Sequence, residues 1–127
     1  PFRRVGNMIY CAGVISTTPE GILTGKVGSE RALEYGQDAA KACALNALAV
    51  LDQALGGLDH LKQLVSVSGY VNAESGYPDS PLVINGASDL FNTVLGEKGA
   101  HARAAVAVAG LPKNAAVEIQ VIAEAEN

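Results

Sequence analysis

The chain has 127 residues, enough for one domain with a buried core, and we interpret residues 1–127 as a single domain. Its net charge is −4, without a run of Lys or Arg or a row of aromatic residues, which argues against nucleic-acid binding. No apolar stretch reaches the ~18 residues of a membrane span, and no signal peptide is recognisable. The first residue is Pro1 and a strand is predicted almost at once, so we expect an N-terminal segment to precede it.

Composition also bears on the core and the surface. Hydrophobic residues make up 49% and aromatic residues 5%, so Ala, Val, Leu and Ile must build most of the core. Charged residues make up 17%, below the usual quarter, and we expect a partner subunit to cover part of the surface.

Cys11 and Cys43 are expected to be free thiols in a reducing compartment, the cytoplasm. His60 and His101 lack the spacing of metal ligands, so we expect no metal site.

The first part of the chain predicts strands. Phe2–Val5 is a short candidate strand, and Gly6-Asn7 is a strong signal for a two-residue turn. Met8–Ser16 is mostly apolar and predicts a buried strand, which Gly13 interrupts. A glycine at that place indicates a bulge or the close approach of another backbone or a ligand. Residues 17–28 are polar and predict a loop, with room for an edge strand.

Two helices are predicted with a strand between them. In Ser29–Leu55 the apolar residues keep three- and four-residue spacing, with Ser29 as N-cap. Leu64–Val71 alternates and predicts a strand. Ser80–Leu95 is the second helix, with Ser80 as N-cap and a proline at its first helical position. One of its faces carries a polar stripe more typical of a solvated surface than of a site: Asn85, Ser88 and Asn92.

The end of the chain predicts a β-hairpin, with arms Ala102–Ala109 and Val117–Glu124 around a turn rich in Gly, Pro and Asn. Each arm carries one ionisable residue, Arg103 and Glu118, about 10 Å apart by strand rise. That gap suits a small molecule with a carboxylate at one end. The alternative is a structural ion pair between the two side chains. On a strand of Ala and Val, Arg103 is expected to be partly withdrawn from water.

The predicted order is therefore β-β-α-β-α-β-β. Single strands alternating with helices favour an α+β domain, a mixed sheet with both helices packed on one face. The other face of such a sheet is bare, and nothing else in the chain can cover it. Self-association is expected for this reason.

The sequence resembles the Rid family, also called YjgF-type or endoribonuclease L-PSP-like proteins. The resemblance is strongest in ARAAVAVAGLPKNAAVEIQVIAE and extends to VGNMIYCAG and to Gln37–Leu51. The stretches GQDAAKACALNALAVL, INGASDL and HARAAV are most similar to a less characterised branch with few assigned activities. The resemblance implies a chorismate-mutase-like fold and a homotrimer with a cleft at each subunit interface.

The resemblance also implies an activity, the hydrolysis of reactive enamines and imines such as 2-aminoacrylate to 2-oxo acids and ammonia, without metal or organic cofactor. Arg103 matches the arginine that grips the substrate carboxylate, as a guanidinium can. Glu118 matches the glutamate that positions or activates water. Asn85 matches an asparagine at the cleft, and Gly13 a strand position whose backbone lines it.

Two departures separate this chain from the family's deaminases, which carry Ser and often Cys where Ala12 and Ala105 stand here. Their cleft tyrosine would lie upstream of Pro1. We therefore keep a second interpretation, a non-catalytic small-carboxylate-binding or interaction protein on the same trimer. A third, a ribonuclease, comes only from the family's older name, and the acidic charge disfavours it.

Overall fold

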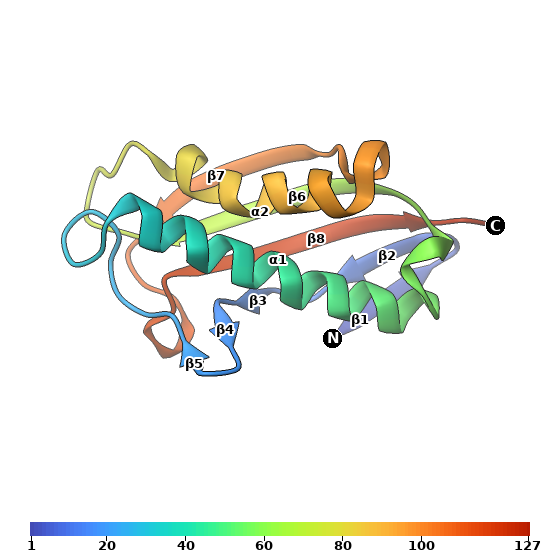
Figure 1. The fold of residues 1–127 in the computed structure, drawn as a ribbon, viewed down its shortest axis with the longest axis horizontal. Coiled ribbons are helices and arrows are strands. Elements are labelled where there is room, and N and C mark those ends of the chain that lie inside the picture. The colour runs from blue at the N-terminus through green and yellow to red at the C-terminus, as the bar shows by residue number, and fades with distance from the viewer.

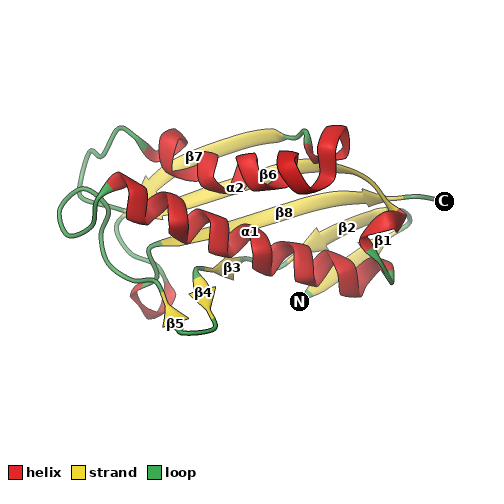
Figure 2. Cartoon of the chain, in the orientation of Figure 1, coloured by secondary structure: helices red, strands yellow, loops and turns green.

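The computed structural model describes residues 1–127, in which two helices lie across one face of a single large sheet (Figures 1 and 2). The strands of this sheet are β1 (Phe2–Val5), β2 (Met8–Cys11), β3 (Val14–Ile15), β6 (Leu61–Asn72), β7 (Ala102–Val108) and β8 (Val117–Ala125). The helices are α1 (Leu33–Leu55) and α2 (Ser80–Leu95), and a separate small hairpin is formed by β4 (Thr17–Thr18) and β5 (Gly21–Ile22). The α+β class and the order of the main elements are confirmed, and the predicted strand over residues 8–16 is broken at Ala12 and Gly13.

The strands follow the order β1-β2-β8-β6-β7, with β3 pairing with β8 beyond the end of β2. All pairs are antiparallel except β6 and β7, so the sheet is mixed. The predicted hairpin of the last two strands is wrong, because β6 lies between β7 and β8. Helix α2 carries the chain back across the sheet, so that β7 runs parallel to β6 at the edge.

The connection between β7 and β8 passes over the end of β6. Lys113 and Asn114 adopt positive φ there, which turns the chain sharply. The buried side chain of Asn72, the last residue of β6, donates to Asn114 Oδ1 at 3.2 Å and to the Ala115 carbonyl at 3.1 Å. These bonds satisfy the polar groups of the crossing and hold it against the strand it spans.

Both predicted N-caps are wrong. Helix α1 begins at Leu33 rather than near Ser29, because residues 26–31 form a turn in which Arg31 Nε donates to the Thr24 carbonyl at 2.9 Å. Helix α2 has Asp79 at its N-cap position and Ser80 already inside it. The Ser80 hydroxyl is buried without a hydrogen-bond partner.

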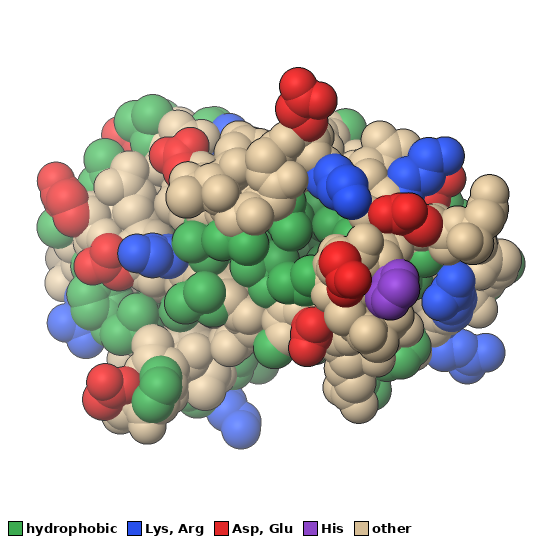
Figure 3. Space-filling view, turned by 45° about the vertical axis from the view of Figure 1, so that its right-hand side comes forward, with side chains coloured by type: hydrophobic (Ala, Val, Ile, Leu, Met, Phe, Trp, Pro, Cys, Tyr) green, Lys and Arg blue, Asp and Glu red, His purple; other side chains and the backbone are tan.

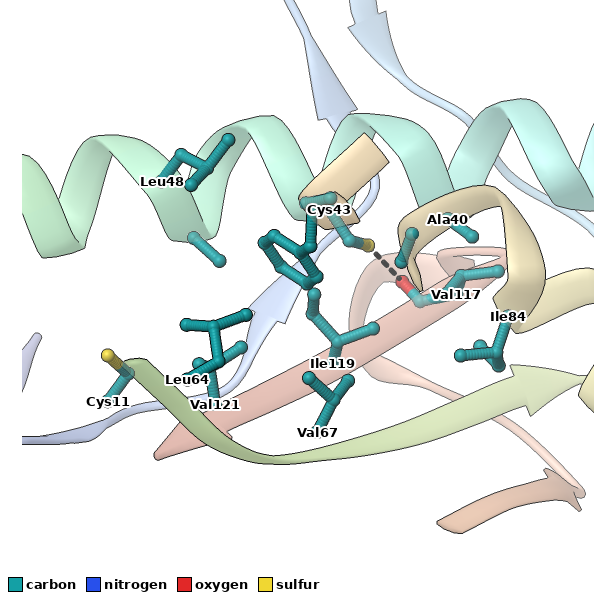
Figure 4. Packing of buried hydrophobic residues seen from close by; sticks show 14 of the residues in the cluster. Cys11, Ala40, Cys43, Leu48, Leu64, Val67, Ile84, Val117, Ile119 and Val121 are labelled. Atoms are coloured by element: carbon teal, nitrogen blue, oxygen red, sulfur yellow. Dashed lines mark hydrogen bonds between the residues drawn. The ribbon is translucent and has the colours of Figure 1, made fainter. Parts of the chain in front are cut away.

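The core fills the space between the helices and the sheet (Figure 4). Small residues such as Ala40 and Cys43 let α1 lie close to the sheet, against branched residues such as Ile119. The helices approach each other closely at Gly86, where a Cβ atom would collide with the backbone of Gln37. This close crossing fixes the position of α2 relative to the sheet.

The opposite face of the sheet is not covered by any element (Figure 1). Tyr10 and Val106 on this face are 44% and 48% exposed. On the side of the molecule seen in Figure 3, basic and acidic side chains alternate around apolar surface. No helix combines the length and apolar character that a membrane crossing requires.

Candidate functional site

Arg103 lies on edge strand β7 and points to the helix side of the sheet, because it pairs with the core residue Val67. Its Nη1 donates to Asn85 Oδ1 at 2.8 Å and to Ser88 Oγ at 3.2 Å, and its Nη2 donates to the Pro81 carbonyl at 3.4 Å. All three acceptors belong to α2. The structure therefore brings Arg103 and Asn85 together, as the resemblance implies.

Arg103 has no carboxylate partner, and its remaining N–H groups make no hydrogen bond within the chain. A guanidinium has five N–H groups, so about two are free to bind a ligand. The side chain is exposed, and the expectation that its charge is withdrawn from water is wrong for the single chain. The reason is the edge position of β7, which leaves one side of the strand open.

Ser88 and His101 extend this hydrogen-bonded group. Ser88 Oγ lies 2.9 Å from His101 Nε2, and His101 Nδ1 lies 2.6 Å from the Gly99 carbonyl. A carbonyl only accepts, so the proton is on Nδ1, and Nε2 accepts from the Ser88 hydroxyl. The edge of the Phe91 ring meets the imidazole, with the ring centroids 6.0 Å apart.

These side chains surround a cavity of about 390 Å³ on the helix side of β7. It is lined by Asn85, Ser88, Asp89, Asn92, Ala100, His101 and Arg103. From the sequence, Ser88 and Asn92 were expected to lie in a solvated stripe, and no role was predicted for His101. The three-residue step from Asn85 to Ser88, which places both on one helix face, was the signal that could have been used.

Glu118 lies on β8 with its side chain on the uncovered face, opposite to its core neighbours Val117 and Ile119. It is half-buried and pairs with Tyr70 of β6 and Ile15 of β3. Its carboxylate lies over Gly13, where a Cβ atom would collide with it. A close approach at Gly13 was predicted from another backbone or a ligand, and the neighbour is instead the Glu118 side chain.

Helix α1 holds this second group in place. Asn46 donates from Nδ2 to the Ile15 carbonyl at 3.1 Å and to the Thr17 carbonyl at 3.0 Å, which fixes β3 beside β8. Gln120, two residues after Glu118 and on the same face, donates to the Cys11 carbonyl at 3.2 Å. The Glu118 carboxylate has no hydrogen bond or salt bridge in the chain.

The candidate residues thus form two separate groups within one chain. We call Arg103 and Asn85 the arginine half-site, and Glu118 and Gly13 the glutamate half-site. The half-sites lie on opposite faces of the sheet, with β6 between their strands and three residue steps along β6 between their rungs. Within one chain Arg103 and Glu118 do not form the ion pair that was the alternative, because neither residue takes part in a salt bridge.

The two alanines that depart from the family pattern fall into different groups. Ala12 precedes Gly13 and helps line an open cavity of about 360 Å³ beside Tyr10 and Gln120. Ala105 lies two residues after Arg103 on the same strand face and packs partly against the core. Each half-site therefore has one methyl group where the deaminases carry a polar side chain.

Neither cysteine is placed as a nucleophile. Cys43 is buried in the core and donates from Sγ to the Val117 carbonyl at 3.4 Å (Figure 4). Burial, reinforced by the negative charge of Glu118, raises the pKa of the Cys43 thiol far above its ordinary value. Burial also raises the pKa of Cys11. Both thiols are therefore protonated near neutral pH.

The largest cavity lies elsewhere, at the carboxyl ends of β6 and β7, with a volume of about 570 Å³. Lys26 on its wall donates to Asn72 Oδ1 at 3.1 Å and to the Ala109 carbonyl. Those contacts tie a loop to the end of the sheet. None of the residues expected from the sequence lines this cavity. No three His, Cys, Asp or Glu side chains gather in a way that could hold a metal ion.

Comparison with protein families gives one match over nearly the whole chain. The family model described as "YjgF/chorismate mutase-like, putative endoribonuclease" matches residues 1–125. Protein TCP17 of Trypanosoma cruzi is 44% identical over 108 residues, which cover 84% of this chain and 68% of that protein.

Solved structures give the same answer. Protein Atu1372 of Agrobacterium tumefaciens has a TM-score of 0.97 and 43% identity, covering 100% of this chain and 82% of that one. A protein of Shewanella oneidensis described as a "putative endoribonuclease" has a TM-score of 0.93 and 30% identity, covering 98% of this chain and 83% of that one. RidA of a Psychrobacter species has a TM-score of 0.64 and 28% identity, covering 97% and 85%.

Proposed function

The chain belongs to the YjgF/chorismate mutase-like family, the Rid family, and from this premise we propose that it hydrolyses small reactive enamines or imines to 2-oxo acids and ammonia. The reaction takes place in clefts between the subunits of a homotrimer. Each cleft joins the arginine half-site of one copy to the glutamate half-site of the next.

One observation carries the proposal. Arg103 and Glu118 are both charged, both lack an ionic partner, and they lie on opposite faces of one sheet. A single chain cannot apply both to one small molecule. Three copies related by rotation can, because each then presents its arginine half-site to one neighbour and its glutamate half-site to the other. The uncovered sheet face supplies the surface for such an assembly.

The chemistry follows from the two half-sites. The free N–H groups of Arg103 bind the substrate carboxylate, and Asn85 keeps the guanidinium in place. Glu118 takes a proton from water as the water oxygen bonds to the carbon of the protonated imine, which gives a carbinolamine. That proton then passes to the nitrogen. As the C–N bond breaks, Glu118 takes the proton of the carbinolamine hydroxyl and passes it to the ammonia, so that a 2-oxo acid and an ammonium ion leave. No step calls for a metal or an organic cofactor.

Gly13 contributes to the glutamate half-site because it has no side chain. The space beside it is taken by the Glu118 carboxylate, which a Cβ atom at residue 13 would displace. The carboxylate therefore keeps its place on the rim of the sheet without a partner in its own chain. A general base must be both unpaired and fixed in position, and the glutamate half-site provides for both.

A second candidate is a non-catalytic binder of small carboxylates on the same trimer. Ala12 and Ala105 favour it, because they remove a polar group from each half-site. The ribonuclease named in some relatives is a weaker candidate, since basic side chains do not gather on the surface seen in Figure 3. Two free, protonated cysteines fit the reducing cytoplasm, where we place the reaction.

The test is release of ammonia and 2-oxo acid from 2-aminoacrylate generated in place. We expect release above the spontaneous rate, and loss of this excess in Glu118→Gln. Glu124→Gln is the matched control, since Glu124 lies on the same face of β8 but pairs with Lys62. If the wild type gives no excess release but binds pyruvate, the binder is right and the deaminase is wrong.

A further inference from the structure

We propose that Ser88 and His101 form a nucleophile–base pair, and that the cavity on the helix side of β7 transfers acyl groups from small esters that carry one negative charge. This activity shares only Arg103 and Asn85 with the proposed deaminase. It needs neither Glu118 nor a second subunit, because Ser88, His101 and Arg103 belong to one chain and line one cavity.

The geometry is that of an activated serine. Ser88 Oγ lies 2.9 Å from His101 Nε2, within reach for direct proton transfer. The Gly99 carbonyl, 2.6 Å from Nδ1, holds the proton on that nitrogen and leaves Nε2 as the base. It thus orients the imidazole as a third group does in catalytic triads. The Phe91 ring, at an interplanar angle of 85°, limits tilting of the imidazole.

Arg103 supplies the positive charge that such a site needs. Its Nη1 lies 3.2 Å from Ser88 Oγ, so the guanidinium adjoins the place where negative charge develops during attack. Asn85 and the Pro81 carbonyl hold the guanidinium there. The N–H groups that remain free can bind an anionic group of the substrate. Asp89 on the same wall repels a second negative charge, which favours a substrate with only one.

The position of Ser88 also fits a reacting group. Its residue is only 9% exposed, yet it lines the cavity of about 390 Å³. Solvent access to the hydroxyl is therefore through that cavity. A cavity of this size has room for a small ester.

The reaction balances without any further reactant than water. Ser88 Oγ bonds to the ester carbonyl carbon while its proton moves to His101 Nε2. The carbon–oxygen bond to the alcohol breaks, and the alcohol takes the proton from Nε2. Water then attacks the acyl-serine, gives a proton to Nε2, and that proton returns to Ser88 Oγ as the carboxylic acid leaves.

The experiment uses the full chain with mono-4-nitrophenyl adipate, which is negatively charged, and 4-nitrophenyl acetate, which is neutral. We expect 4-nitrophenolate release, with the charged ester preferred at least about tenfold, and loss of that preference in Arg103→Met. Mass spectrometry of the quenched reaction should find the adipoyl group on Ser88. Acylation elsewhere, or none, would overturn the proposal whatever any variant does.

Matched variants separate catalysis from folding. His101→Gln should lower the rate about a hundredfold, whereas His60→Gln, which changes the chain's other histidine, should not change it. Ser88→Ala should abolish acylation, and Ser75→Ala in the larger cavity should keep it. If Ser88→Ala does not fold, Ser88→Cys keeps a nucleophile and should still be acylated at residue 88. Equal rates for wild type and His101→Gln would contradict the pair.

Discussion

Arg103 and Glu118 point away from each other, one to the helix side and one to the bare side of the same sheet, with strand β6 between them. Along the strands their β-carbons are three residue steps apart, which is about 10 Å in total. Across the sheet they are two strand spacings apart, which is also about 10 Å in total. Two charges so placed cannot neutralise each other or hold one small molecule within a chain. The two side chains can act on one small molecule only if copies of the chain assemble.

Removal of Arg103 should abolish carboxylate binding. Arg103→Ala loses the only guanidinium of its half-site, and Arg103→Lys restores a charge but not the two-pronged contact. Calorimetric titration of pyruvate or 2-oxobutanoate should show no binding by the alanine variant and weakened binding by the lysine variant. Unchanged affinity in Arg103→Ala would show that the carboxylate binds elsewhere. Thermal melts should change little, because Arg103 is exposed.

The bare face should be the surface through which the copies associate. Val106 is 48% exposed on this face, next to Tyr70 and on the same rung as Glu118, so Val106→Glu should dissociate the trimer. Val94 on α2 is 50% exposed, and Val94→Glu is the matched control that should remain trimeric. Analytical ultracentrifugation at micromolar concentration measures both. A wild type that sediments as a monomer would contradict the assembly.

Gly13→Ala should impair the reaction more than the fold. The added methyl group displaces the Glu118 carboxylate, which is the flexible end of its side chain, so the cost in stability is small. We expect the excess ammonia release to fall to near the spontaneous rate. Gly110→Ala is the control, since its Cβ would meet no atom within 4 Å. Full activity in Gly13→Ala would mean that the position of Glu118 does not matter.

Restoring the family's polar groups should raise deaminase activity. Ala12→Ser and Ala105→Cys each return a hydrogen-bonding side chain to one half-site. A hydrogen bond made only in the transition state contributes on the order of 1 kcal/mol, up to roughly tenfold in rate. Rates of 2-oxo acid release should therefore exceed those of the wild type. Unchanged rates in the double variant would show that these groups are not limiting here.

Cys43 should make the fold sensitive to alkaline pH. Burial raises the pKa of its thiol in the folded chain, so above about pH 8.5 the unfolded chain loses a proton that the folded chain keeps. The free energy of unfolding then falls by up to about 1.4 kcal/mol per pH unit from this group. Denaturant unfolding between pH 8 and 10, with reductant present, should show a smaller fall in Cys43→Ala. Parallel pH curves would contradict the burial of a neutral thiol.

Local patterns in the sequence located the elements. Apolar residues at three- and four-residue spacing predicted both helices. Alternation of apolar and polar residues predicted strands with one face on the core, such as Val117–Ala125. Alternation cannot tell which strand is the neighbour, and the hairpin prediction failed for that reason. Strand β7 lies beside β6 because α2 carries the chain back over the sheet. The connection from β7 to β8 then crosses the end of β6, where the Asn72 side chain holds it by hydrogen bonds. The N-cap prediction for Ser29 was wrong because residues 26–31, which precede α1, form a turn. Hydrogen bonds of the Glu30 and Arg31 side chains hold this turn.

The resemblance implies one cleft lined by Arg103, Asn85, Glu118 and Gly13. Within one chain these residues form two pairs, Arg103 with Asn85 and Glu118 with Gly13. Their separation onto opposite faces follows from the register of three strands, which no local pattern contains. Ser88 and His101 were missed because their contact joins a helix to the start of a strand thirteen residues later.

The central claim is that the reacting site is shared between copies of the chain, and subunit complementation tests it directly. Arg103→Ala and Glu118→Gln, each inactive alone as a deaminase, are unfolded together, refolded as mixed trimers and assayed for 2-oxo acid release from 2-aminoacrylate. In random trimers about one quarter of the clefts join an intact Arg103 to an intact Glu118 of the neighbour, so about one quarter of wild-type activity should return. A mixture that stays as inactive as its components would contradict a site shared between subunits.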